Sequence, residues 1–306
     1  MGNEQIGAQR QAAADGAQSG TDASSQDTAG RVWLITGASS GFGRALAEAV
    51  LAAGDTVVAA ARRTAPLEDL VARYPDRARA IELDVTDQQR AAAAVADIVL
   101  WYGRIDVLVN NAGRALIGAV EETSDRELRD LVELHFFGPA ALTRAVLPHL
   151  RERRSGAIVQ LTSMGGRISF AGVGAYSAGK FALEGLTEAL AEEVAPFGIK
   201  VMIVEPGGFR TGLAGSAAAQ TPALEAYAET VGAFREAFPA TDGQQPGDPA
   251  KAAAAIIAAI DDPHPPLRLV LGNDAYDVIG ERLRASQQEM ATWEKLGRDV
   301  EFDAAE

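Results

Sequence analysis

Three side chains that can hold or move a proton lie close together along the chain: Ser163, Tyr176 and Lys180. Tyr176 and Lys180 are four residues apart, and residues at that spacing share one face of a helix. A phenol with a pKa of about 10 exchanges protons poorly at neutral pH, but a nearby cation favours the phenolate and lowers that pKa. The pattern predicts an acid–base tyrosine activated by a lysine, with the Ser163 hydroxyl bonded to a reacting oxygen. The alternative is an ordinary, half-exposed helix face.

A glycine-rich turn opens the folded part of the chain. Gly37, Gly41 and Gly43 follow the apolar run 32–36 and lead into a helical pattern that begins near Phe42. Glycines allow the backbone to approach a diphosphate closely, and a helix N-terminus offers free N–H groups and a favourable dipole. The turn predicts a nucleotide cofactor. The alternative is that the glycines serve only the sterics of a tight strand-to-helix turn.

Short β-branched runs alternate with longer helical patterns, which is typical of βαβ units in a parallel sheet. The fold class predicted is α/β, a doubly wound sheet of seven parallel strands flanked by helices. The strands are expected near 32–36, 56–61, 78–83, 106–110, 156–162, 200–205 and 268–272. Two helix starts are marked, one by a capping box at Ser124–Glu127 and one by Asp248 followed by Pro249.

Four regions differ in composition. Residues 1–30 have almost no large apolar side chains and are interpreted as a flexible leader. Residues 31–272 form the expected catalytic domain, and residues 273–306 a helical extension. The insertion 211–247 carries apolar residues at helical spacing, which predicts one amphipathic helix over the substrate site. Those apolar residues are Leu224, Tyr227, Val231, Phe234 and Phe238.

Composition excludes several classes of site. The chain has 306 residues and no cysteine, so disulfides and thiolate chemistry are excluded. His149 and His264 are far apart in sequence, which argues against a metal site. A formal charge of −14 argues against a nucleic-acid partner, and no apolar run approaches the about 20 residues of a spanning helix. We expect a soluble cytoplasmic protein without a membrane partner.

The end of the second predicted strand indicates which cofactor binds. Ala61 stands where a carboxylate would repel a 2′-phosphate, and Arg62 and Arg63 follow it. Guanidinium groups bind phosphate with charge-assisted hydrogen bonds. NADP(H) is therefore favoured over NAD(H), with Arg62 the better candidate. The alternative is a solvated strand end.

Taken together, these motifs resemble those of the short-chain dehydrogenase/reductase family in its single-domain form, across nearly all of residues 31–272. The matches are Thr36–Gly43 to its TGxxxGxG loop, Asp84-Val85 to its adenine contact, Asn110–Gly113 to NNAG, Ser163 to its serine, Tyr176 with Lys180 to YxxxK, and Pro206, Gly207 and Thr211 to PGxxxT. The resemblance implies a Rossmann-type fold. It also implies the following cofactor contacts: Gly37, Ser39, Ser40, Gly41, Phe42, Gly43, Arg62, Arg63, Asp84, Val85, Asn111, Ala112, Gly113, Tyr176, Lys180, Pro206, Gly207 and Thr211.

One position departs from the family pattern. His135 stands where the family usually has an asparagine whose backbone carbonyl holds a water in a relay to the lysine. If only the carbonyl is needed, histidine substitutes with little loss. If the side chain takes part, an imidazole titrating near neutrality would alter the pH profile. His135 is therefore a candidate catalytic residue, and the alternative is a packed histidine.

The resemblance implies hydride transfer between the nicotinamide and a carbonyl carbon, with Tyr176 as acid or base and Lys180 holding the ribose hydroxyls. Apolar residues near the site favour a bulky ketone or secondary alcohol, although the same residues could simply seal the body of the protein. They are Met164, Ile168, Phe170, Leu116, Ile117 and the 211–247 stripe. A homodimer or homotetramer is expected by resemblance. The competing functions are an epimerase or dehydratase and a redox-sensing regulator without turnover.

Overall fold

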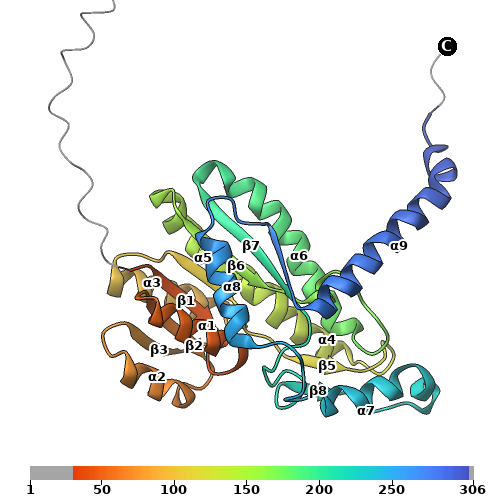
Figure 1. Ribbon diagram of the computed structural model, residues 1–306, viewed down its shortest axis with the longest axis horizontal. Helices are drawn as coiled ribbons and strands as arrows, with labels where there is room; N and C mark the ends of the chain where they lie inside the picture. Colours follow the sequence, from red (N-terminus) through yellow and green to blue (C-terminus); the bar gives the residue numbers. More distant parts are fainter. Residues whose placement is uncertain (1–29, 303–306) are drawn as a thin grey trace, which may run out of the picture. The chain divides into compact units, whose positions relative to one another are not determined.

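The computed structural model describes residues 30–302 (Figure 1). Its centre is a seven-stranded parallel sheet with the order β3-β2-β1-β4-β6-β7-β9. The strands are β1 (Val32–Thr36), β2 (Thr56–Ala61), β3 (Ala78–Glu82), β4 (Val107–Asn110), β6 (Gly156–Leu161), β7 (Ile199–Pro206) and β9 (Arg268–Leu271). The predicted fold class is confirmed, and each predicted strand agrees with an observed one to within one residue at either end.

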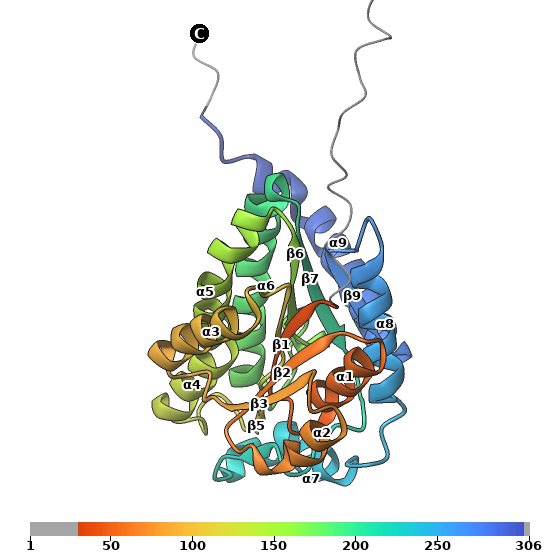
Figure 2. The same cartoon turned by 90° about the vertical axis from the view of Figure 1, so that its left-hand side faces the viewer.

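Helices cover both faces of the sheet, as Figure 2 shows. They are α1 (Gly41–Ala52), α2 (Glu68–Arg73), α3 (Gln88–Tyr102), α4 (Asp125–Val132), α5 (Gly138–Arg153), α6 (Gly174–Val194), α7 (Ala233–Ala240), α8 (Pro249–Asp261) and α9 (Asn273–Arg298). Short 3-10 turns lie at Ala65–Leu67, Met164–Gly166, Ala195–Phe197 and Glu225–Tyr227, and π-helical turns at Glu133–Phe137 and Ala228–Gly232. The predicted caps of α4 and α8 are confirmed, since Ser124 and Asp248 accept the expected backbone hydrogen bonds.

Each strand supplies side chains to two hydrophobic cores, because successive residues point to opposite faces. In β1, Trp33 and Ile35 pack under α1, α2 and α8, whereas Val32 and Leu34 pack under α3, α5 and α6. All four side chains are almost completely buried. Strands covered on both faces are apolar throughout, and this explains why the sheet was predictable from apolar runs.

A second, two-stranded parallel sheet was not predicted. It joins β5 (Ala115–Ile117) to β8 (Ala218–Gln220), about a hundred residues further along the chain. The insertion 211–247 also differs from the single helix that was expected. From Glu225 to Ala240 it passes through 3-10, π and α turns, so its apolar side chains do not form one continuous stripe. Val231 is buried, while Leu224 is 44% exposed.

The predicted leader lies outside the described residues except for Gly30. The C-terminal extension is the long helix α9, which buries Ala275 and Ile279 in its first turns. The rest of α9 extends away from the sheet and the other helices (Figure 1). Residues 303–306 lie outside the described part.

Candidate active site

The glycine turn is held against the end of β4 by close backbone contacts. A Cβ on Gly37 would lie 2.9 Å from the Ala112 Cα. A Cβ on Gly43 would lie 2.5 Å from both the side-chain Nδ2 of Asn111 and the carbonyl oxygen of Gly37. Gly37 and Gly41 also have positive φ values of 63° and 55°, which favour glycine. The steric explanation and cofactor binding are therefore compatible, since the same contacts fix the shape of the turn at the N-terminus of α1.

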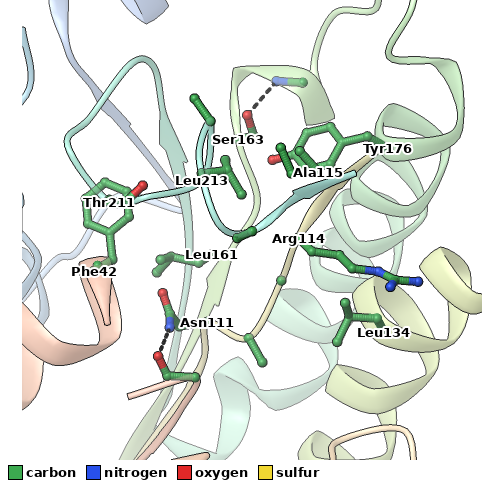
Figure 3. Close-up of a pocket in the computed structure, with 18 of the residues that line it drawn as sticks. Phe42, Asn111, Arg114, Ala115, Leu134, Leu161, Ser163, Tyr176, Thr211 and Leu213 are labelled. Atoms are coloured by element: carbon green, nitrogen blue, oxygen red, sulfur yellow. Dashed lines mark hydrogen bonds between the residues drawn. The ribbon is translucent and has the colours of Figure 1, made fainter. Parts of the chain in front are cut away.

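Asn111 fixes this turn through its side chain. The Asn111 Nδ2 donates to the carbonyl oxygens of Thr36 at 2.7 Å and Gly37 at 3.2 Å. The Thr36 hydroxyl in turn accepts hydrogen bonds from the backbone N–H groups of Asn111 and Ala112. Two motifs about seventy residues apart are thus joined into one rigid edge (Figure 3).

Ser163, Tyr176 and Lys180 converge beside this edge. Ser163 follows the end of β6, and the other two lie on the first two turns of α6. Figure 3 shows the Tyr176 hydroxyl directed toward Ser163. The Lys180 Nζ lies 5.9 Å from the centre of the Tyr176 ring and donates a 2.8 Å hydrogen bond to the Leu161 carbonyl oxygen. The structure thus brings the three predicted residues together at one place.

The protonation of this trio differs from the expectation. Burial raises the pKa of Tyr176 above its usual value, although the hydrogen bond with Ser163 lowers it. Burial also lowers the pKa of Lys180 to about 8, against which the nearby Glu184 charge raises it. The predicted lowering of the tyrosine pKa by lysine is not found, because desolvation of the phenol outweighs a cation that is bonded to Leu161.

His135 is a packed histidine in the π-helical turn between α4 and α5. It is fully buried, its Nε2 accepts a 3.3 Å hydrogen bond from the Arg114 backbone N–H, and its ring meets Tyr176 edge-on at 5.3 Å. Gly179 makes room for it, since a Cβ there would lie 2.9 Å from the His135 Cβ. Burial, with the charges of Lys180 and Arg114, lowers the pKa of His135 well below 6.5. A side chain titrating near neutrality, the consequence expected if the imidazole took part in the relay, is therefore not supported, because burial disfavours the charged form.

Arg62 and Arg63 lie at the opposite end of the site, after β2. Both side chains are exposed, and neither forms an ion pair with another described residue. Asp84 is nearby: burial raises its pKa, but hydrogen bonds from Thr86 and the charge of Arg62 bring it below the usual value. Both guanidinium groups are thus free to bind an anion at this end.

A single cavity of about 940 Å³ connects the two ends. Every predicted site residue lines it except Gly43 and His135, which lie behind its wall. The lining also includes three aromatic side chains, Phe170, Phe234 and Phe238. The Phe234 ring centre lies 5.1 Å from that of Phe170 and 5.3 Å from that of Phe238.

The apolar residues predicted for the substrate site divide into two groups. Leu116, Ile117 and Met164 also line the cavity. Ile168, Leu224, Tyr227 and Val231 do not. Tyr227 instead donates a hydrogen bond to Glu121. The sequence left open whether the insertion lines the substrate site or seals the body of the protein. The structure shows both, because part of the insertion lines the cavity and part of it packs elsewhere.

An ion pair anchors the insertion. The Arg235 Nη2 lies 2.6 Å from the Glu122 carboxylate, of which only 1% is exposed. Glu122 also accepts hydrogen bonds from the backbone N–H groups of Ala119 and Leu224. Nothing in the local pattern around Glu122 indicates a partner more than a hundred residues away.

Two buried carboxylates lie behind Lys180. Glu184, one helical turn further along α6, is 4% exposed, and Glu205 at the end of β7 is fully buried. Arg268 contacts both, with its Nη2 3.2 Å from Glu184 and its Nε 3.1 Å from Glu205. Burial raises the pKa of Glu184 to about 7, and the Glu205 charge adds to this. Neither carboxylate was singled out from the sequence.

Within 30–302, no group of three or more histidine, cysteine or acidic side chains is placed to bind a metal ion. No helix in the same range has the length and apolar character needed to cross a membrane.

The chain is similar in sequence to known proteins. Residues 31–222 match the family described as short chain dehydrogenase. Oxidoreductase BOA17 of Botryotinia fuckeliana is 40% identical over 267 residues, covering 87% of this chain and 97% of the relative. A 3-ketodihydrosphingosine reductase of Bacteroides thetaiotaomicron is 37% identical over 246 residues, covering 79% and 88%.

Solved structures agree with these relatives. A short-chain dehydrogenase from Streptomyces avermitilis is 60% identical, has a TM-score of 0.85, and is matched over 90% of this chain and 100% of its own. A short-chain dehydrogenase from Burkholderia cenocepacia in complex with NADP is 26% identical with a TM-score of 0.67, over 86% and 97% of the two chains. The protein described here belongs to the short-chain dehydrogenase/reductase family, whose members are oxidoreductases that act on CH–OH or C=O groups with a nicotinamide cofactor.

Proposed function

We propose that this protein is an NADP(H)-dependent carbonyl reductase, or alcohol dehydrogenase in the reverse direction, for bulky apolar ketones. The observation that carries the proposal is the single cavity, which Ser163, Tyr176 and Lys180 line together with Arg62 and Arg63, two arginines that form no ion pair with a described residue. When bound, the cofactor supplies or accepts the hydride. All other steps fall to the side chains of this chain.

Proton transfer is assigned to Tyr176. In the reductive direction its hydroxyl donates a proton to the oxygen of the carbonyl group, to which the Ser163 hydroxyl also donates a hydrogen bond. Burial, which raises the pKa of Tyr176, keeps the phenol protonated and ready to act as an acid. Lys180 would bind the ribose hydroxyls with its ammonium group, which is present below a pH of about 8.

The role of His135 is proposed to be positioning. Its neutral ring packs edge-on against Tyr176 and fixes the backbone N–H of Arg114 at the cavity wall. A π-helical turn is often found at functional sites, and this turn sets the His135 ring between α6 and the segment after β4. No proton transfer is assigned to the imidazole.

The preference for NADP(H) is supported by Arg62 and Arg63. Both line the cavity next to Asp84, and Ala61 removes the carboxylate that would repel a 2′-phosphate. The test is a comparison of kcat/KM with NADPH and NADH in wild type and Arg62→Ala. A loss with NADPH of tenfold or more, roughly one charge-assisted contact, with NADH unchanged, supports the assignment. Equal efficiency with both cofactors in wild type contradicts it.

A bulky apolar substrate is supported by the aromatic end of the cavity. Phe170, Phe234 and Phe238 line the same cavity as Tyr176 and contact one another, and the relative from Bacteroides thetaiotaomicron is named 3-ketodihydrosphingosine reductase. Burial of an alkyl chain contributes about 0.8 kcal/mol per CH₂. We therefore expect kcat/KM to rise with chain length in a series of alkyl ketones.

The decisive experiment follows the absorbance of the reduced nicotinamide with a panel of apolar ketones and aldehydes. Wild type should consume NADPH, and Tyr176→Phe should lose about 100-fold or more of kcat while retaining NADPH binding. Binding of NADPH without turnover of any carbonyl or alcohol would favour the redox-sensing regulator. A product with an inverted centre or a lost water would favour the epimerase or dehydratase.

Self-association is also proposed, and α9 supports it. Leu283, Met290 and Trp293 lie on its outer part and are 52%, 76% and 61% exposed. Within α9, Tyr276, Leu283 and Met290 stand seven residues apart and Trp293 follows three residues later, which is the heptad spacing that helices use to pair. We expect a dimer or tetramer by size-exclusion chromatography with light scattering, and a shift toward monomer in a Met290→Glu/Trp293→Glu variant.

The flexible leader and the cytoplasmic location stay predictions.

A further inference from the structure

Asp274, in the first turn of α9, lies directly behind the turn that follows β7. The Asp274 Oδ2 accepts a 2.6 Å hydrogen bond from the Gly208 backbone N–H. The preceding N–H, that of Gly207, donates to the Leu271 carbonyl oxygen at 2.9 Å. Two consecutive N–H groups of this turn are therefore bound by the segment 271–274, and Asp274 is one of the residues that line the cavity.

Glycines make room for this carboxylate. A Cβ on Gly207 would overlap both oxygens of Asp274, and one on Gly272 would lie 2.6 Å from Oδ1. Gly272 also has a φ of 98°, which glycine adopts readily. Asp274 forms no ion pair with any other described residue. A negative charge is thus held at the cavity wall with no protein cation to neutralise it.

The position of Asp274 along the cavity follows from the sheet. β7 pairs with β6 in parallel, with Val204 next to Leu161, so Pro206–Gly208 lie beside Ser163. Hydride transfer requires the nicotinamide to lie next to the carbonyl group that Ser163 and Tyr176 hold. The glycine turn, which contacts Phe209 and Thr211, and Arg62 would hold the phosphates. The nicotinamide end of the cavity is therefore the end that Asp274 lines.

We propose that Asp274 makes this site bind the oxidised cofactor, whose nicotinamide ring is positively charged, more tightly than the reduced cofactor, whose ring is neutral. The proposal rests on the cofactor binding described above. Loss of hydride by the reduced nicotinamide creates one positive charge on the ring, and a nearby carboxylate stabilises that charge. The phosphates are the same in both forms, so their attraction to Arg62 cancels in the comparison. The consequence is that hydride donation to a carbonyl group becomes more favourable on the enzyme.

The test measures equilibrium dissociation constants of NADP⁺ and NADPH, without any carbonyl substrate, by fluorescence titration. Asp274→Asn retains an oxygen that can accept the Gly208 N–H but removes the charge. We expect the ratio Kd(NADP⁺)/Kd(NADPH) to rise by about threefold or more, which is a modest Coulomb effect at a partly exposed site. The matched control is Asp277→Asn, the same change at an exposed position of the same helix, and it should leave the ratio unchanged.

Two results would overturn the proposal. If Asp274→Asn leaves the ratio unchanged, or weakens both cofactors equally, the carboxylate only holds the turn. Asp274→Ser, measured in the same way, replaces Asp274→Asn if the latter does not fold. Failure here is distinct from failure of the proposed function, because the ratio is read without turnover. Binding of neither cofactor would refute both proposals.

Discussion

The two ends of the cavity are built in different ways. At the cofactor end, Gly37, Gly43 and Asn111 touch through backbone and short side chains, and each contact lies at the carboxyl edge of adjacent strands. At the substrate end, the insertion is held by the Glu122–Arg235 pair and by the small β5–β8 sheet, and its helical turns are irregular. The first end is fixed by steric contacts that few substitutions preserve. The second depends on a few side chains, so it can be altered while the cofactor site stays intact.

The largest effect is expected from Gly43→Ala, which tests the rigidity of the cofactor end. A Cβ here would lie 2.5 Å from the Asn111 Nδ2 and the Gly37 oxygen, so the turn must move. We expect NADPH affinity to fall by about 100-fold and the free energy of unfolding by about 1–3 kcal/mol, measured by fluorescence titration and urea denaturation. The control is Gly185→Ala, where a Cβ meets nothing within 4 Å. It should gain about 0.5–1 kcal/mol, and an equal loss in both variants would contradict the account.

The next effect concerns the substrate end. Arg235→Met leaves the Glu122 carboxylate without its cation, which we expect to destabilise the insertion. KM for an apolar ketone should rise about tenfold or more as the insertion opens, while Kd for NADPH stays constant.

Arg298→Met is the control for that loss. It breaks an exposed pair with Glu294 and should change stability by less than about 1 kcal/mol. An NADPH affinity that falls in parallel with the ketone KM in Arg235→Met would show that the two ends are not independent.

The pH dependence of catalysis tests the role of Lys180, which lines the cavity together with Tyr176 and the cofactor-binding residues. Burial lowers the pKa of Lys180 to about 8, so its ammonium is present below that pH and is lost above it. We expect kcat/KM for ketone reduction to decline as pH rises through about 8. Because the Glu184 charge raises the pKa of Lys180, Glu184→Gln should move this decline to lower pH. A profile that is flat to pH 10, roughly the range of an unperturbed lysine, would contradict the assignment.

The smallest effect is on stability and concerns Glu184 alone. Its pKa in the folded protein, about 7, lies above its ordinary value of 4.5. The folded state therefore binds the proton more tightly, and stability falls as pH rises from 4.5 to about 7. We expect a loss of about 1–3 kcal/mol over this range by urea denaturation. Glu184→Gln should show a smaller decline, and an identical decline in both proteins would remove Glu184 as its cause.

The sequence indicated the cofactor end better than the substrate end, for a physical reason. Glycine turns, the apolar strands and the Tyr176–Lys180 spacing are local patterns, and local patterns follow from helix and strand geometry. The β5–β8 sheet, Glu122 with Arg235, and Asp274 with Gly208 join residues far apart along the chain. No periodicity marks such pairs.

Protonation was the least predictable property. The i,i+4 spacing correctly put Tyr176 and Lys180 on one face, but the pKa of each depends on how deeply the fold buries it. His135 illustrates the same limit, since burial lowers the pKa of its imidazole well below the usual value and the sequence position does not indicate that burial. How deeply a polar side chain is buried depends on contacts with residues far away in the sequence, so a local pattern does not predict it.

The most direct test of the account uses NADPH deuterated at the transferring position of the nicotinamide, with a long-chain ketone as acceptor. Mass spectrometry of the alcohol should find one deuterium at the carbinol carbon with wild type, and almost none with Tyr176→Phe over the same time, although both proteins bind NADPH. Unlabelled alcohol from wild type, or equal labelling by both proteins, would contradict hydride transfer governed by Tyr176.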